Sequence, residues 1–264
     1  MPMSNLVATE IPYLRRYARI LTGSQSLGDG LVRELLEAAL ADGALRADLS
    51  KSRARLFAGF TRIWNSVGRT LPSGREWPEV EQESVASRLG EAKPLARQAL
   101  LLEAVEGFSV SEIAEILDVA EADVSAMIAE AAQAVEAGGR TEVLIIEDEP
   151  LIAFQLEEII TGMGNRVAGI ATTHEEAVKL FNERRPGIVL ADIQLADGSS
   201  GIDAVNEIMA DGDVPVIFIT AFPERLLTGE RPEPTYLITK PFSDDYVRAT
   251  VGQVMFFGST AYLV

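Results

Sequence analysis

Hydrophobic positions divide the chain into two parts that have different periods. In residues 1–137, apolar side chains recur at intervals of three, four and seven, which predicts amphipathic helices. From residue 142 onward, short apolar runs alternate with helical segments, which predicts βα units and a parallel sheet covered on both faces. The pair Gly138-Gly139 separates the two patterns, and paired glycines end helices and form joints. We therefore expect a linker at residues 138–141.

The first part is expected to be entirely helical. Ser109 and Glu112 have the spacing of a capping box, and Asp118-Val119 is expected to form the turn of a helix-turn-helix. A stretch rich in glycine, proline and charge predicts a connector at residues 69–93, between helical regions at 1–68 and 94–137. Within these regions we expect helices near residues 14–21, 31–40, 52–67, 81–90, 94–106, 109–117 and 121–136.

The second part, residues 142–264, is expected to form one α/β domain. Five βα units predict a flavodoxin-like (βα)5 fold, in which ligands bind at the carboxyl ends of the strands. Thr173 and Glu176 have a second capping-box spacing. The strands are expected near residues 143–147, 167–171, 187–191, 215–220 and 235–239, and regular helices near 150–163, 174–185 and 201–211.

Charge restricts the possible partners of the chain. The net charge of −17 argues against nucleic acid and anionic membrane as the main partners. Residues 98–139 contain no lysine or arginine and nine acids, although a module that binds duplex DNA needs cations to neutralise phosphates. The chain contains no cysteine, and it shows neither a signal-peptide pattern nor a membrane-length apolar run, so a cytoplasmic protein is expected.

A small basic cluster lies near the start of the chain, at Arg15, Arg16 and Arg19. Two interpretations are open: a solvated helix face, or a contact with the acidic surface of the second part.

Acids and one lysine follow the predicted strands. Glu147 and Asp148 end the first strand, Asp192 the third, Thr220 the fourth and Lys240 the fifth. Three converging carboxylates repel one another unless a cation lies among them. Mg²⁺ takes oxygen ligands and engages phosphate oxygens, and a metal with a lysine balances the charge of a transferring phosphoryl group. The pattern therefore predicts a site that accepts a phosphoryl group.

Residues 142–255 resemble a two-component receiver domain, on these same residues. The resemblance implies that Asp192 is the phosphoacceptor and that a sensor histidine kinase supplies the phosphoryl group. It also implies that Glu147, Asp148 and Asp192 hold Mg²⁺ together with the backbone carbonyl of Gln194.

The same resemblance assigns roles to the last two strands. Thr220 is implied to be the hydroxyl that moves toward the phosphoryl group, and Lys240 the lysine that contacts it, with a cis bond to Pro241. The switch position three residues before the lysine, usually aromatic in the family, is Leu237 here, with Tyr236 next to it.

The first part resembles extracytoplasmic-function sigma factors. Residues 10–65 are similar to region 2 and residues 94–136 to region 4. In a working region 4, the last helix directs several arginines or lysines toward promoter DNA. Here its outward positions are expected to hold Ala122, Asp123, Ser125, Ala126, Ala129 and Glu130.

A sigma-like region followed by a receiver resembles the PhyR-type general stress response regulators of alphaproteobacteria. The resemblance implies an anti-anti-sigma factor: phosphorylation of Asp192 frees the sigma-like part to bind an anti-sigma factor of the NepR type, which releases the true sigma factor. No multiple-turnover reaction and no direct DNA binding are then expected. Two alternatives are a receiver-gated sigma factor or transcription regulator that binds DNA, and a metal-dependent phosphohydrolase.

Overall fold

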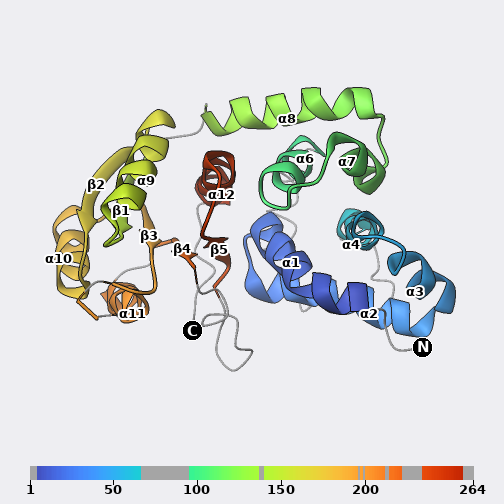
Figure 1. Cartoon of the computed structure of the whole chain (residues 1–264), viewed down its shortest axis with the longest axis horizontal. Helices are drawn as coiled ribbons and strands as arrows, with labels where there is room; N and C mark the ends of the chain where they lie inside the picture. The colour runs from blue at the N-terminus through green and yellow to red at the C-terminus, as the bar shows by residue number, and fades with distance from the viewer. Residues whose placement is uncertain are drawn as a thin grey trace. The chain divides into compact units, whose positions relative to one another are not determined.

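The chain forms two compact units, Met1–Gln133 and Ala134–Val264. Figure 1 shows the first as a group of helices and the second as a sheet with helices on its faces. The expected connector at 69–93, the helix expected near 81–90 and the glycine pair at 138–139 lie outside the described residues. The computed structural model describes residues 5–66, 95–136, 140–195, 197–198, 200–211, 214–221 and 234–257.

The first unit is all-helical, as predicted, around a core of large apolar side chains. The ring of Tyr17 packs against those of Phe57 and Phe60 at centroid distances of 5.5 and 5.8 Å. The short helix at Gly43–Leu49 was not expected from periodicity. It is capped by Asp42, whose carboxylate accepts hydrogen bonds from the backbone N–H groups of Ala44 and Leu45. The helices are α1 (Asn5–Thr22), α2 (Gln25–Ala41), α3 (Gly43–Leu49), α4 (Arg53–Ser66), α6 (Leu95–Ala104), α7 (Val110–Leu117) and α8 (Glu121–Glu136).

Helices α1 and α2 cross closely, and the basic cluster lies at this crossing. A Cβ on Gly28 would approach the backbone nitrogen of Arg19 to 2.7 Å, so only glycine fits there. Arg15 and Arg19 both donate to the carboxylate of Asp29, at 2.9 and 2.6 Å. Arg16 instead reaches Glu106, in the loop between α6 and α7. The interpretation of the cluster as a solvated face is therefore wrong.

The helix-turn-helix forms at α7 and α8, as predicted. Ser109 makes the full capping box with Glu112, and Asp118 ends α7 in the left-handed conformation with φ 56°. On the inner side of α8, Val124 is fully buried, while Met127 is only half-buried. The predicted outward positions are all exposed: Ala122, Asp123, Ser125, Ala126, Ala129 and Glu130.

The second unit is a five-stranded parallel sheet in the predicted order β2-β1-β3-β4-β5. Helices α9 and α12 contact each other over one face, and α10 and α11 contact each other over the opposite face (Figure 1). The elements are β1 (Glu142–Ile146), α9 (Pro150–Gly162), β2 (Arg166–Ala171), α10 (His174–Arg184), β3 (Ile188–Ala191), α11 (Gly201–Asp211), β4 (Val216–Thr220), β5 (Tyr236–Thr239) and α12 (Asp244–Phe257).

Helix α10 begins with the predicted cap but not with a full capping box. The hydroxyl of Thr173 accepts a hydrogen bond from the backbone N–H of Glu176, as expected. The carboxylate of Glu176, however, accepts from the backbone and hydroxyl of Thr172 instead of from Thr173. The glutamate therefore binds one residue before the N-cap, and the reciprocal half of the capping box is absent.

None of the described helices combines the length and the apolar character that a membrane crossing requires.

Candidate functional site

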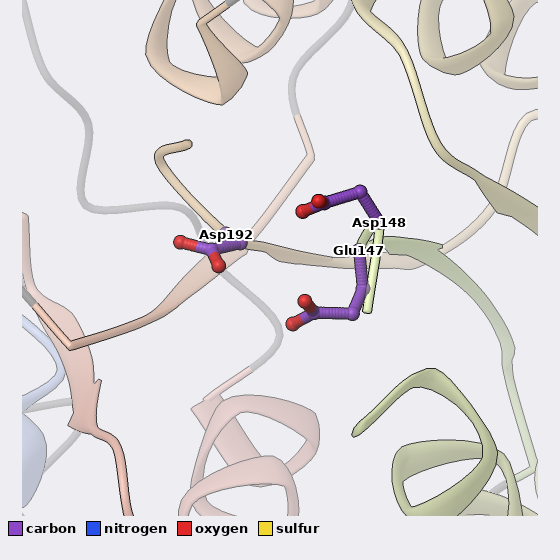
Figure 2. A group of neighbouring side chains, drawn as sticks. All are labelled: Glu147, Asp148 and Asp192. Atoms are coloured by element: carbon purple, nitrogen blue, oxygen red, sulfur yellow. The ribbon is translucent and has the colours of Figure 1, made fainter. Parts of the chain in front are cut away.

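Two adjacent strands bring three carboxylates together. Strands β1 and β3 are paired in parallel with Ile146 opposite Ala191, and the backbone N–H of Asp192 donates to the carbonyl of Ile146 at 2.8 Å. The residues that follow these strands must therefore lie side by side. Glu147, Asp148 and Asp192 each place a carboxylate oxygen within 4.8 Å of the others, and Figure 2 shows these side chains at the two strand ends.

Strands β4 and β5 supply a lysine to the same edge. The backbone N–H of Lys240 donates to the carbonyl of Thr220 at 2.9 Å, and the bond from Lys240 to Pro241 is cis, as expected. The ammonium group lies 2.7 Å from Oδ2 of Asp192 and 2.8 Å from Oε2 of Glu147. The structure thus brings together the predicted acids and the predicted lysine.

The Asp192 carboxylate has a fixed orientation. Its Oδ1 accepts hydrogen bonds from the backbone N–H groups of Ile193 and Gln194, at 2.6 and 3.3 Å, while its Oδ2 accepts from Lys240. Its side chain is 10% exposed, so it is largely buried but still in contact with solvent. Thr220 is fully buried at the end of β4, next to Lys240 along the sheet edge.

Burial and the ion pairs with Lys240 shift the pKa values of this site in opposite directions. Burial raises the pKa of Glu147 to about 7, aided by the nearby charge of Asp192 and opposed by the hydrogen bond from Lys240. Burial disfavours the ammonium of Lys240, but its hydrogen bonds to Asp192 and Glu147 outweigh this and raise its pKa. The lysine is therefore held as a cation, and further positive charge would favour the ionised form of Glu147.

The residues present fit a divalent cation. Although Oε2 of Glu147 lies close to the lysine, it is buried and accepts no well-aligned hydrogen bond among the described residues. Asp148 is half-buried beside it. Carboxylate oxygens with spare lone pairs are what hard divalent cations bind, so this cluster could hold one.

Sequence reasoning missed one residue of this site, Gly201. A Cβ at this position would lie 1.7 Å from the backbone carbonyl oxygen of Asp192. The backbone N–H of Gly201 also donates to the carbonyl of Ile193 at 3.1 Å. Helix α11 therefore begins directly against the peptide of Asp192, which only a residue without a side chain permits.

A five-stranded parallel α/β unit whose strand ends carry this acid–lysine cluster defines a receiver domain of the two-component type, and the chain joins it to a helical unit that contains a helix-turn-helix. The family models agree with this division. The sigma2 domain of PhyR matches residues 7–61, the sigma-like domain of the response regulator PhyR matches 89–137, and the response regulator receiver domain matches 143–251.

The chain belongs to the PhyR family of response regulators. It is 49% identical to the phyllosphere-induced regulator PhyR of Methylorubrum extorquens, over 99% of this chain and 97% of that protein. It also resembles the crystal structure of PhyR from Brucella abortus, with a TM-score of 0.82 and 47% identity over 97% of this chain and 95% of that one.

A third similar protein is the anti-anti-sigma factor PhyR from Bartonella quintana. Its crystal structure gives a TM-score of 0.81 at 45% identity, over 97% of this chain and 96% of that one. The Bartonella quintana protein has also been crystallised in complex with the anti-sigma factor NepR.

Proposed function

We propose that this protein is a phosphorylation-controlled anti-anti-sigma factor of the general stress response. One observation carries the proposal: a receiver site and a helix-turn-helix whose exposed α8 face lacks cations occur in the same chain. Such a face does not suit promoter DNA, because DNA affinity depends on phosphate neutralisation. A sigma-like shape without that charge suits a protein that recognises sigma factors. We therefore infer a partner of the NepR type, an anti-sigma factor.

In this proposal, a carboxylate oxygen of Asp192 attacks the phosphorus of a phosphohistidine on a sensor histidine kinase. The O–P bond forms as the N–P bond breaks, and the departing imidazole nitrogen keeps the bonding electrons and takes up a proton. The backbone N–H groups of Ile193 and Gln194 orient the attacking carboxylate. Since the product stays on the chain itself, one transfer occurs for each protein and no turnover is expected.

Two further residues are proposed to act on the transferred group. The ammonium of Lys240, now 2.7 Å from Asp192, pairs with a phosphoryl oxygen after transfer, and the hydroxyl of Thr220 moves toward the same group. The carboxylates of Glu147, Asp148 and Asp192 and the backbone carbonyl of Gln194 would hold Mg²⁺, which would supply positive charge for the phosphoryl oxygens.

Release of the sigma-like unit is proposed to follow as a shift between two populations. Phosphorylation must stabilise the binding-competent state more than the resting state, and a shift from 1:99 to 99:1 requires about 5.5 kcal/mol. The freed unit then binds the anti-sigma factor, and the sigma factor that this inhibitor held is released to RNA polymerase.

Co-purification with a small NepR-type anti-sigma factor tests this function. The full chain is expected to retain the anti-sigma factor when acetyl phosphate and Mg²⁺ are present and to lose it when they are absent. Promoter DNA in place of the anti-sigma factor is expected to give no retention. Retention of DNA, which would depend steeply on salt, would favour a receiver-gated sigma factor instead.

Adding cations to the exposed face of α8 is expected to create DNA affinity. The triple variant Asp123→Arg, Ala126→Arg, Glu130→Arg changes three exposed positions, so the fold should persist. At low salt it should bind duplex DNA at least about tenfold more tightly than the wild type, because each added cation can neutralise a phosphate. Fluorescence anisotropy with a labelled duplex measures this. An unchanged affinity at low salt would show that the missing cations do not explain the lack of DNA binding.

Replacing Gly201 by alanine is expected to slow phosphorylation of Asp192. The new Cβ would overlap the carbonyl of Asp192, so the phosphoacceptor or α11 must shift. Since a displacement of about 1 Å can cost up to about 100-fold in rate, we expect a loss of about 10- to 100-fold. Intact mass over time with acetyl phosphate gives the rate.

Gly198, in the loop between β3 and α11, offers a matched control for Gly201. It has φ +80°, but a Cβ there would meet nothing within 4 Å. Gly198→Ala should therefore strain the loop by about 1–3 kcal/mol while leaving the phosphorylation rate within a few-fold of the wild type. Equal losses in the two variants would show that loop strain, and not the approach to Asp192, controls the rate.

A further inference from the structure

The first unit contains two modules that the sequence treats as separate. We define the region 2-like module as α1 to α4, residues 5–66, and the helix-turn-helix module as α6 to α8, residues 95–133. These modules correspond to two different family models, yet they lie in one compact unit. Helix α4 packs on α7, and α1 packs on α6. The contacts at this junction therefore determine the arrangement of the two modules relative to each other.

Arg53, at the start of α4, uses all three nitrogens of its guanidinium group at the junction. Its Nε donates to the carboxylate of Glu10 at 2.8 Å. Its Nη1 donates to the backbone carbonyl of Glu106 at 2.7 Å, and its Nη2 to the carboxylate of the same residue at 2.6 Å. All three nitrogens are therefore engaged, and two of them hold the loop between α6 and α7.

The flat face of the same guanidinium group is also covered. Its central carbon lies 4.3 Å from the ring centroid of Phe108 in the helix-turn-helix module and 5.1 Å from that of Phe57 in the region 2-like module. The two rings pack edge to face, with centroids 4.9 Å apart. Arg53 thus combines ion pairs, a backbone hydrogen bond and cation–π contacts at one point.

Glu106 completes this arrangement from the opposite module. Its side chain is fully buried, and Arg16 of α1 donates to it as well, at 3.0 Å. Burial raises the pKa of Glu106 to about 7, and the charges of Arg16 and Arg53 oppose this shift. The bond of Arg53 to the backbone carbonyl and its stacking on Phe108 do not depend on the charge of the carboxylate.

We propose that Arg53 is a positioning residue for capture of the anti-sigma factor: its guanidinium group fixes the helix-turn-helix module on the region 2-like module, so that the partner meets both as one preformed surface. This rests on the proposed function, in which the sigma-like unit binds an anti-sigma factor. A partner that contacts both modules binds more weakly if the modules are not already in the right arrangement. The free energy needed to order them is then subtracted from the binding free energy. Buried ion pairs of this kind can specify an arrangement even where they add little stability.

Arg55 provides a matched control for the role of Arg53. It lies two residues along the same helix and also pairs across the junction, with Glu115 of α7 at 2.6 Å. Both of these side chains are substantially exposed, at 44% and 39%, so the pair should contribute little. Lysine keeps the charge at either position but has neither the planar fork nor the stacking face of arginine. Arg53→Lys and Arg55→Lys therefore compare the same substitution at a buried and at an exposed pair.

The first measurement is the affinity of the full chain for NepR of Bartonella quintana, in the presence of acetyl phosphate and Mg²⁺. Arg53→Lys is expected to weaken binding by about tenfold or more, a typical size for a coupling between sites, and Arg55→Lys by less than about twofold. Equal affinity of Arg53→Lys and wild type would overturn the inference alone. Failure of the wild type to bind would instead count against the proposed function.

The second measurement reports the arrangement of the modules directly. The chain contains no cysteine, so Leu40→Cys and Ala126→Cys place one label on an exposed position of each module without side reactions. The label-to-label distance distribution is expected to be narrow in the wild-type background, broad with Arg53→Lys and narrow with Arg55→Lys. It should also stay unchanged when the anti-sigma factor binds. A large change on binding would contradict a preformed surface.

Phe108→Leu provides a second variant if Arg53→Lys does not fold. It removes the aromatic face beneath the guanidinium group and leaves the ion pairs in place. It should lower the affinity and broaden the distances in the same direction. Wild-type values in both measurements would overturn the inference.

Discussion

Replacing Asp192 by asparagine is expected to abolish phosphoryl uptake. The amide has nearly the shape of the carboxylate, so the backbone hydrogen bonds from Ile193 and Gln194 to its oxygen can persist. However, a neutral amide is a poor nucleophile and no longer balances the ammonium of Lys240. Intact mass after incubation with acetyl phosphate and Mg²⁺ should show one added phosphoryl group in the wild type and none in the variant.

Asp203→Asn is the control for this experiment. Asp203 lies exposed in the first turn of α11, close in sequence to the site but outside the acid cluster. It should accept the phosphoryl group as the wild type does. Full uptake by Asp192→Asn would show that another residue is the acceptor. More than one added group in the wild type, or steady release of inorganic phosphate at a high rate, would favour a phosphohydrolase.

Removal of the divalent cation is expected to have the second-largest effect. Without it, Glu147, Asp148 and Asp192 repel one another, and Lys240 is the one side-chain cation paired with them among the residues that the structure describes. A bound metal contributes several kcal/mol to such a transfer, so excess chelator should slow uptake from acetyl phosphate by at least about 100-fold. The rate is measured by intact mass at several Mg²⁺ concentrations.

Asp148→Asn tests which residues hold the cation. Asp148 is half-buried in the acid cluster, so its loss should raise the Mg²⁺ concentration needed for half-maximal rate without removing the acceptor. Saturating Mg²⁺ should then restore part of the rate. An undiminished rate in excess chelator would contradict a role for the metal, and an unchanged Mg²⁺ requirement in Asp148→Asn would exclude this residue as a ligand.

The sequence predicted the acid site and the described elements other than α3, because they follow from local periodicity and strand order. In a parallel sheet the carboxyl ends of neighbouring strands meet at one edge, so Glu147 and Asp192 could be placed together without coordinates. The outward face of α8 followed in the same way from helical spacing. The close approach of Gly201 to Asp192 did not follow, because no periodic signal marks the absence of a side chain.

The junction between the two helical modules was also beyond sequence reasoning. Arg16 and Arg53 are separated from Glu106 by 90 and 53 residues, and nothing in the spacing links them. Glu106 had counted among the acids that repel DNA, but it is buried and paired with arginines of the other module. Long-range ion pairs of this kind are decided by tertiary packing, which local patterns do not encode.

The affinity for a NepR-type anti-sigma factor, with and without phosphodonor, tests partner switching most directly. We expect calorimetry or anisotropy to show that acetyl phosphate and Mg²⁺ strengthen binding to the wild type by about 100-fold, the gain when a competent state rises from 1% to nearly full population. Asp192→Asn should show no gain. Equally tight binding by the untreated wild type, or by Asp192→Asn with phosphodonor, would contradict control by phosphorylation of Asp192.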